Sequence, residues 1–243
     1  MLYEVGTEWS GEPSSDNGAY GLYPVNSSDI LIENCYAYGA SDAGIYVGQS
    51  DKAIVRNSTA TGNVAGIQIE NTTNADVYGN TVRDNAAGIM VFDLPDLSQY
   101  GGRTRVFNNT IIDNIRGNFS APGGIVAEVP AGTGILVMST SEVEIFDNTL
   151  EGNNVMGTAI ASYAALVALG LRGAIQDPNY NPYPGSIYVH GNSYSKCNTY
   201  PDAAEQSTFG NMLVGSFGSN PIPEYSVGWY FYAGWRSIGC DLY

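Results

Sequence analysis

The sequence predicts an all-β fold, a parallel β-helix with coils of about 22 residues, and three observations lead to it. Glycines recur at a fixed spacing, at Gly44, Gly66 and Gly88. Each glycine is followed by two apolar residues separated by one other residue, as in Ile45 and Val47. A repeat of this length indicates a solenoid, and alternation with a period of two indicates strands rather than helices.

The coils are expected in order along most of the chain. The first spans residues 18–42 and is one residue longer than the period, because Gly21 and Gly44 lie 23 positions apart (44 minus 21). The extra residue is expected near Ser41, where a bulged turn absorbs it. Residues 43–92 hold the regular coils. Later coils resume at residues 103–114, at 133–153, at 158–160 with Ala159 in the glycine position, and at 187–193.

Three insertions interrupt the repeat. The first two span residues 93–102 and 115–132, and both contain Gly and Pro. The third lies between residues 160 and 187, with a short helix expected at Tyr163–Leu171 and a loop at Asp177–Gly185. Long loops on a regular scaffold are where functional residues tend to gather.

The repeat predicts one domain, a β-helix over residues 1–194 with an irregular cap over residues 195–243. Leu2–Val5 already reads as a strand, with no capping element before it. Because the open end of a solenoid is normally covered, we expect either coils that precede Met1 or a partner chain on this end.

The composition is acidic, with 24 Asp and Glu against 9 Lys and Arg and a net charge of -15. Such a charge repels nucleic acid and anionic membranes, and it also disfavours a polyanionic substrate unless calcium or local arginines offset it. The sequence has neither a run of 18 apolar residues nor a signal-peptide pattern in its first residues. An acidic β-solenoid of this kind is expected outside the cell, at the cell surface or in the periplasm.

The three cysteines suggest no metal chemistry. Cys35 lies in a repeat and is expected to be a small buried core residue. Cys197 and Cys240 both lie in the C-terminal region, and their spacing leaves open whether they form a disulfide. No CxxC or Cys/His cluster is present, so a zinc or redox site is not expected.

Aligning the coils on the glycine predicts two ladders of stacked side chains. The first is a polar ladder at a corner of the coil, where side chains hydrogen-bond each other and the turn backbone; its members are Cys35, Ser58, Asn80, Asn109, Asn148 and Asn192. The second places His190, the one histidine, in line with Tyr78, Phe107 and Phe146. We interpret His190 as a ladder residue, with a general base as the alternative.

An outward-facing column is the predicted binding strip. Alternation places Tyr23, Tyr46, Gln68 and Met90 outside the coils, stacked one coil apart. Aromatic faces and amide groups suit sugar rings. The insertions at 93–102 and 115–132 emerge nearby and are expected to wall a groove.

The repeated unit AGIxV…VxxNT…DN resembles the right-handed parallel β-helix repeat of the pectate-lyase-like superfamily over residues 18–193. That group includes polysaccharide lyases, mannuronan C5-epimerases and NosD-type copper-maturation proteins. The segments GAYGLYPV, SDAGIYVGQS and NVAGIQIENT look closest to those of bacterial parallel β-helix repeat proteins. Alginate epimerases carry a Tyr-Gly-Phe/Ile-Asp-Pro-His motif. Residues Tyr20–Val25 match it in Tyr, Gly and Pro, but Tyr23 and Val25 stand at the Asp and His positions. The resemblance therefore does not support catalysis by that acid/base pair.

Other residues remain as candidates for catalysis. A uronate lyase or epimerase needs a base and a cation that neutralises the carboxylate. Tyr23 or Tyr46 is the candidate base, and Arg103, Arg105 or Arg116 the candidate cation, the alternative being arginines that pair with surface acids.

Carboxylates offer two further possibilities. Glu70 and Asp93, on adjacent coils, are a candidate pair for a hydrolase, the alternative being two solvated side chains. Acidic loop residues are candidate Ca²⁺ ligands, although no EF-hand pattern is present; no other cofactor or metal is expected.

Taken together, these patterns predict a secreted or envelope protein that binds or acts on carbohydrate through an extended groove, with polysaccharide or glycan as its partner. If it is an enzyme, a polysaccharide lyase or epimerase is expected. The alternative is a non-catalytic structural or surface-assembly protein whose open coil end stacks on a partner chain.

Overall fold

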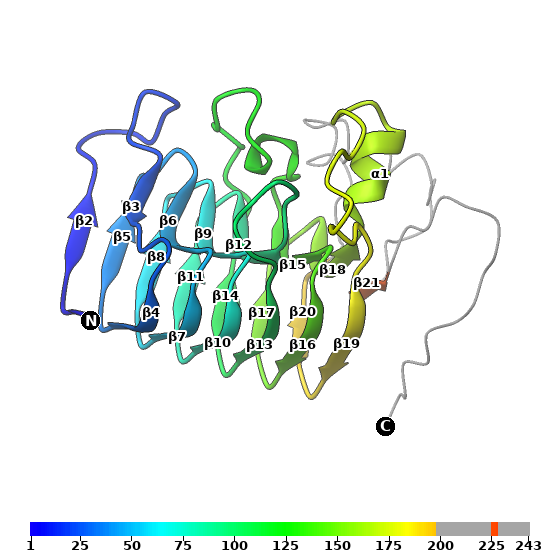
Figure 1. Ribbon diagram of the computed structural model, residues 1–243. Helices are drawn as coiled ribbons and strands as arrows, with labels where there is room; N and C mark the ends of the chain where they lie inside the picture. The colour runs from blue at the N-terminus through cyan, green and yellow to red at the C-terminus, as the bar shows by residue number, and fades with distance from the viewer. Residues whose placement is uncertain (198–224, 228–243) are drawn as a thin grey trace.

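The computed structural model describes residues 1–197 and 225–227. These residues form three parallel sheets, here named A, B and C, each containing seven strands (Figure 1). The chain passes through sheets C, A and B in turn, and each pass adds one strand to each sheet. The fold is therefore the predicted parallel β-helix.

The strands of each sheet follow one another along the axis. Sheet A contains β1 (Leu2–Tyr3), β4 (Ser28–Glu33), β7 (Asp51–Arg56), β10 (Thr73–Tyr78), β13 (Gly102–Phe107), β16 (Ser141–Phe146) and β19 (Gly185–His190). Sheet B contains β2 (Gly6–Glu8), β5 (Tyr36–Tyr38), β8 (Thr59–Thr61), β11 (Thr81–Arg83), β14 (Thr110–Ile112), β17 (Thr149–Glu151) and β20 (Ser193–Ser195). Sheet C contains β3 (Tyr20–Leu22), β6 (Ala43–Gly48), β9 (Ala65–Glu70), β12 (Ala87–Phe92), β15 (Thr133–Met138), β18 (Met156–Ala161) and β21 (Tyr225–Val227).

The register confirms the predicted period and the longer first coil. Ala43 pairs with Ala65 and Ala65 with Ala87, each 22 residues on. Tyr36 pairs instead with Thr59, 23 residues on (59 minus 36). The extra residue therefore lies between β5 and β6, around the predicted Ser41.

One predicted alignment is wrong. In sheet C, Ile135 pairs with Thr158 and Val137 with Ile160. Gly157 therefore takes the glycine position of this coil, and the strand begins at Met156 rather than at Thr158. The prediction failed because Thr158 replaces the usual apolar residue after the glycine, so Ala159, two residues after Gly157, was assigned to the glycine position.

The core inside the coils is built from the inward-facing residues of all three sheets. The larger inward side chains of β6, β9 and β12 are Ile45, Val47, Ile67, Ile69, Ile89 and Val91, and all are buried as predicted. The glycine before each pair is needed for space. A Cβ at Gly88 would overlap the carbonyl oxygen of Gly134 on the next coil and lie 2.8 Å from Ile111 Cγ2.

Two polar ladders close the coil corners. The predicted ladder from Cys35 to Asn192 is present, with each backbone N–H donating to the side-chain oxygen one coil on. A second ladder joins Asn63, Asn85, Asn114 and Asn153 in the same way. These side chains satisfy backbone groups that would otherwise be buried without partners.

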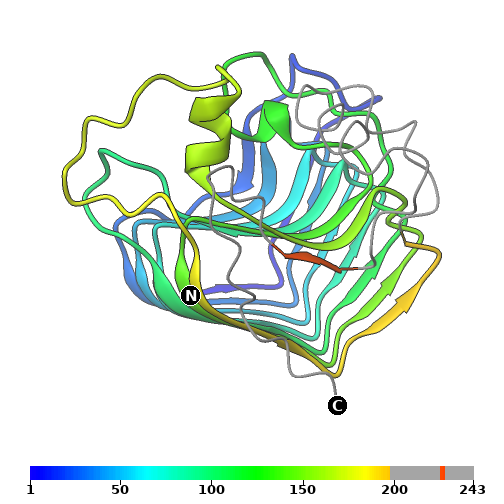
Figure 2. The ribbon, with the colours of Figure 1, turned by 90° about the vertical axis from the view of Figure 1, so that its right-hand side faces the viewer.

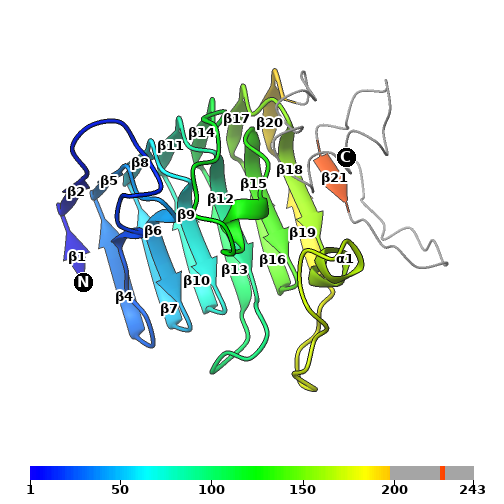
Figure 3. The same ribbon diagram turned by 90° about the horizontal axis from the view of Figure 1, so that it is seen from above.

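Of the three insertions, the second and third lie over the outer face of sheet C, and the first packs along the turns that join sheet C to sheet A (Figures 2 and 3). They span residues 93–101, 113–132 and 162–184, and they contain the 3-10 helix η1 (Val126–Glu128) and the helix α1 (Tyr163–Ala168). Their apolar side chains and the outward side chains of sheet C form a second apolar cluster, which includes Met90, Phe92, Val126, Leu136 and Leu166. Strands β6, β9, β12, β15 and β18 of sheet C are thus buried on both faces.

Hydrogen bonds join the insertions to one another. The Tyr100 hydroxyl and the Asp96 backbone N–H both donate to Asp177, and Arg172 donates to the backbone oxygen of Gly124. The Tyr180 hydroxyl donates to the backbone oxygen of Asp93 at 2.7 Å. The three insertions therefore act as one covering layer.

Some predictions concern residues outside the described part of the chain. Most of the predicted cap at 195–243 falls there, and so does Cys240, whose pairing with Cys197 the sequence leaves open. Cys35 is buried, as predicted. Neither described helix is long and apolar enough to cross a membrane.

Candidate functional site

The predicted binding strip on sheet C is mostly covered. Tyr46, Gln68 and Met90 face outward from the coils, as predicted, but only 3%, 1% and 1% of their surface is exposed. The prediction of an open strip is wrong because the insertions pack onto this face instead of standing beside it as the walls of a groove.

Tyr23, at the N-terminal end of the strip, is the exception. It is 53% exposed, and it lies before the region that the insertions cover. Its ring stacks on Tyr20 with the centroids 4.3 Å apart, and both rings contact Tyr46 at 4.8 Å. The accessible part of the strip is therefore Tyr23, which packs against Tyr20 and Tyr46.

Two acids adjoin these tyrosines, and we name the five residues Tyr20, Tyr23, Asp42, Tyr46 and Glu70 the acid–tyrosine cluster. The Tyr20 hydroxyl donates to Asp42 Oδ2 at 3.4 Å, and the Tyr46 hydroxyl donates to Glu70. Gln68 holds the other side of Glu70, with Nε2 donating to Oε2 at 3.0 Å.

Stacking of successive coils assembles the cluster. Tyr20 begins β3 and pairs with Ala43, beside Asp42. Glu70 ends β9 and pairs with Gly48 on β6. A Cβ at Gly48 would overlap the Tyr46 ring and hydroxyl, so this glycine leaves the space in which Tyr46 reaches Glu70.

The acids of the cluster hold protons more tightly than exposed acids do. Burial raises the pKa of Asp42 to about 6, and the charge of Glu70 adds to the rise. Burial also raises the pKa of Glu70, although hydrogen bonds from Tyr46 and Gln68 oppose it. Asp42, which is only partly buried, can therefore exchange a proton near neutral pH.

Burial and the nearby carboxylates raise the pKa values of Tyr20 and Tyr46 well above the usual range. Both phenols remain protonated at neutral pH and act as hydrogen-bond donors. Tyr46 is also 97% buried (100 minus 3), so the interpretation of Tyr46 as a base is wrong.

Glu70 and Asp93 are both buried, at 8% and 4% exposure, which contradicts the interpretation of two solvated side chains. Asp93 Oδ2 accepts a hydrogen bond from the backbone N–H of Gly101 at 2.9 Å. This contact joins the two ends of the 93–101 insertion, and burial raises the pKa of Asp93 to about 7. Asp93 thus anchors an insertion and does not face an open surface with Glu70.

The arginines proposed as a catalytic cation do not lie at the cluster. Arg103 and Arg105 are on β13 of sheet A, the opposite sheet of the coil, and pair with Glu142 and Asp76 at 3.7 and 2.6 Å. Arg116 pairs with Asp84 at 2.6 Å. Their interpretation as partners of surface acids is the one that the structure confirms.

His190 lies at the end of the predicted aromatic ladder. Its ring stacks on Phe146 at 5.2 Å, and Phe107 and Tyr78 continue the stack at 4.8 Å steps. Its Nε2 lies 3.1 Å from Glu144 Oε1. His190 is therefore a ladder residue on sheet A.

No group of three or more His, Cys, Asp or Glu side chains suited to a metal ion occurs in the part of the chain that the structure describes. Oxygen ligands for Ca²⁺ stay a prediction without a site.

Sequence reasoning missed two members of the cluster. Sequence patterns mark Tyr20 only as part of the epimerase-like motif, and they do not mark Asp42. The signal available was position: Tyr20 directly precedes the glycine of the first coil, and Asp42 lies two residues before the glycine of the second.

Comparisons with known proteins identify the fold. No curated protein matches the chain. Among solved structures, the alginate lyase from Paenibacillus sp. str. FPU-7 is similar over 79% of this chain and 76% of the lyase, at 14% identity and a TM-score of 0.40, too remote to bear on function. The family model described as right handed beta helix region matches residues 14–170. Since that match spans more than half of the chain, the protein belongs to the right-handed β-helix family.

Proposed function

We propose that the protein binds glycan at the acid–tyrosine cluster. The observation that carries this proposal is the half-exposed ring of Tyr23, stacked on Tyr20 beside the partly buried Asp42. An aromatic face takes the C–H face of a sugar, and a carboxyl group takes its hydroxyls. Such a mixture of apolar surface and few polar groups is typical of small-ligand sites.

Hydrogen-bonding capacity at Asp42 supports the same ligand. Its Oδ1 is buried and has no hydrogen-bond partner among the described residues. A buried acceptor without a partner is costly, and a ligand hydroxyl that donates to it would remove that cost.

The charge of the site favours a neutral glycan over a polyuronate. The charged groups that raise the pKa values of Tyr20, Asp42 and Tyr46, within the residues that the structure describes, are the carboxylates of Asp42 and Glu70. The chain as a whole carries -15. A carboxylate-bearing sugar would meet repulsion here without a cation to offset it.

If the site is catalytic, Asp42 is the candidate proton donor. A carboxyl group with a pKa of about 6 can give a proton near neutral pH. We further propose an extracellular, cell-surface or periplasmic location, where polymeric glycans occur.

The test is titration calorimetry of the chain with neutral and uronate oligosaccharides at pH 7. We expect binding of neutral oligomers, loss of at least about tenfold in affinity for Tyr23→Ala, a change of about 1.4 kcal/mol, and no loss for Tyr188→Ala. Tyr188 is a matched control because it is also 53% exposed but lies on sheet A. Preference for uronates, or equal effects of the two variants, would refute the proposal.

Association through the first coils is a second candidate function. Of the eight exposed large hydrophobic residues in the described part, five lie in the first two coils, namely Met1, Tyr3, Trp9, Tyr23 and Tyr36. A concentration of exposed aromatic residues is typical of interaction surfaces. Light scattering on the calorimetry samples distinguishes this function, because it requires a mass that rises with concentration and falls when Tyr3 and Tyr36 are replaced by serine.

A further inference from the structure

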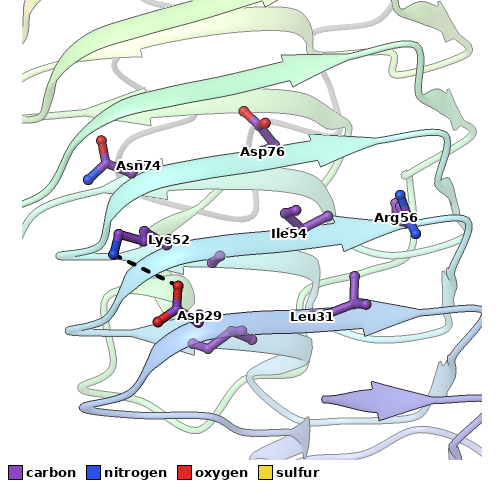
Figure 4. A pocket seen from close by; sticks show the side chains of 9 residues that line it. Asp29, Leu31, Lys52, Ile54, Arg56, Asn74 and Asp76 are labelled. Carbon is purple, nitrogen blue, oxygen red and sulfur yellow. Dashed lines mark ion pairs between the residues drawn. The ribbon is translucent and has the colours of Figure 1, made fainter.

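The outer face of sheet A contains a hollow far from the cluster. The hollow has a volume of about 370 Å³ and lies over β4, β7 and β10 (Figure 4). The insertions pack on sheet C, on the other side of the coil (Figure 2). The outward side chains of these three strands remain at least partly exposed.

The floor of the hollow is apolar. Leu31 and Ile54 are register partners on β4 and β7, and both face outward. Beyond Ile54 the same row continues with Asp76 on β10. The result is a two-residue apolar patch, about the width of one small ring, at the bottom of a polar surface.

Polar side chains stand on either side of this floor. Asp29, Lys52 and Asn74 form one rim, and Arg56 forms the other (Figure 4). The lining holds two cationic and two anionic side chains, Lys52 and Arg56 against Asp29 and Asp76. Its balanced charge contrasts with the -15 of the chain and favours a neutral occupant.

Most of these polar groups are already engaged. Arg56 binds Glu33 at 2.8 Å and the Tyr78 hydroxyl at 2.9 Å. Asp76 binds Arg105 at 2.6 Å, and Asn74 Nδ2 donates to Asp51 at 2.6 Å. These contacts fix the shape of the hollow.

The pair Lys52–Asp29 is different. Its atoms are 3.8 Å apart, and the side chains are 63% and 76% exposed. A long, exposed ion pair contributes little to stability. One donor and one acceptor at the rim are therefore free to reorganise around a ligand.

We propose that this hollow is a second glycan subsite, which takes one neutral sugar ring with its C–H face on Leu31 and Ile54 and its hydroxyls on Lys52 and Asp29. The ligand class rests on the function proposed above, but the site, its residues and its test are independent of the acid–tyrosine cluster. With a subsite on each side of the coil, one molecule would bind two glycan segments.

The test is the stoichiometry of oligosaccharide binding by calorimetry. We expect two sites in the unchanged protein and one in Ile54→Lys, whose longer side chain fills the hollow. Leu31→Ala, which only removes part of the floor, should weaken the second site at least about tenfold. The control is Ile112→Lys, since Ile112 is another partly exposed, outward isoleucine, on β14 of sheet B.

The outcomes separate the two proposals. A single site that is lost in Tyr23→Ala and kept in Ile54→Lys overturns the hollow and leaves the cluster. A single site lost only in Ile54→Lys supports the hollow and overturns the cluster, and no binding at all overturns both. Thermal unfolding checks that each variant is folded. We expect all of them to fold, because the replaced side chains are partly or largely exposed.

Discussion

Single side chains complete the hydrogen bonding of this fold. Asn109 Oδ1 accepts from both the backbone and the side chain of Asn80, while its Nδ2 donates to Val77 and Asn148. This ladder could be predicted from the sequence because it depends only on spacing within a 22-residue repeat. The burial of Glu70 and Asp93 could not be predicted, because it depends on how the insertions fold.

Asp93 gives a prediction at the same scale. In the folded protein its pKa is about 7, against a usual value of 3.8. Between these values the folded state holds a proton that the unfolded state has released, so the unfolding free energy contributed by Asp93 falls as pH rises from about 4 to 7. Asp93→Asn removes this loss and can still accept from Gly101, so we expect it to raise the unfolding free energy at pH 8 by up to a few kcal/mol.

Denaturant unfolding at pH 4.5 and pH 8 measures this effect. The control is Asp29→Asn, the same substitution at a side chain that is 76% exposed and lies on sheet A, away from the insertions. If Asp93→Asn and the unchanged protein lose stability in parallel between the two pH values, Asp93 is not held protonated in the fold.

At the scale of elements, the strands follow from the sequence and their coverings do not. Alternation and the glycine spacing predicted the strands of residues 18–153, and the one misplaced strand, β18, has Thr158 where other coils have an apolar residue. The helix in the third insertion was also predicted, and α1 confirms it. The burial of Tyr46, Gln68 and Met90 was not predicted, because alternation shows the direction of a side chain but not whether another segment covers it.

The glycine position gives a prediction about elements. A Cβ at Gly88 would meet the backbone of Gly134 and the side chain of Ile111, so β12 would have to move away from β15. We expect Gly88→Ala to destabilise the protein by about 1–3 kcal/mol, the usual cost of overpacking, as measured by urea unfolding. Gly124→Ala is the matched control, because the nearest atom to its Cβ would be 3.9 Å away. Equal stability of the two variants would show that neighbouring coils can separate without cost.

At the scale of the whole molecule, the outer face of sheet C is covered from β6 to β18. The end of this sheet at Tyr23 and the hollow on sheet A are accessible. The covering layer closes sheet C from Tyr46 to Ala161, so the predicted extended groove is reduced to its end at Tyr23. The hollow on sheet A lies on the opposite side, over residues that sequence patterns mark only as ordinary outward positions. A regular repeat therefore predicts the architecture well and the accessible surface poorly.

Glycan binding at the acid–tyrosine cluster is tested most directly by hydroxyl-radical footprinting of the tyrosines, with and without a saturating neutral oligosaccharide. We predict that Tyr23 is oxidised in the free protein and protected in the complex, while Tyr188 stays equally reactive and Tyr46, which is 3% exposed, stays unreactive in both. Tyr46 reactivity in the free protein would show that the covering layer is open in solution. An unprotected Tyr23 in the saturated complex would contradict glycan binding at the acid–tyrosine cluster.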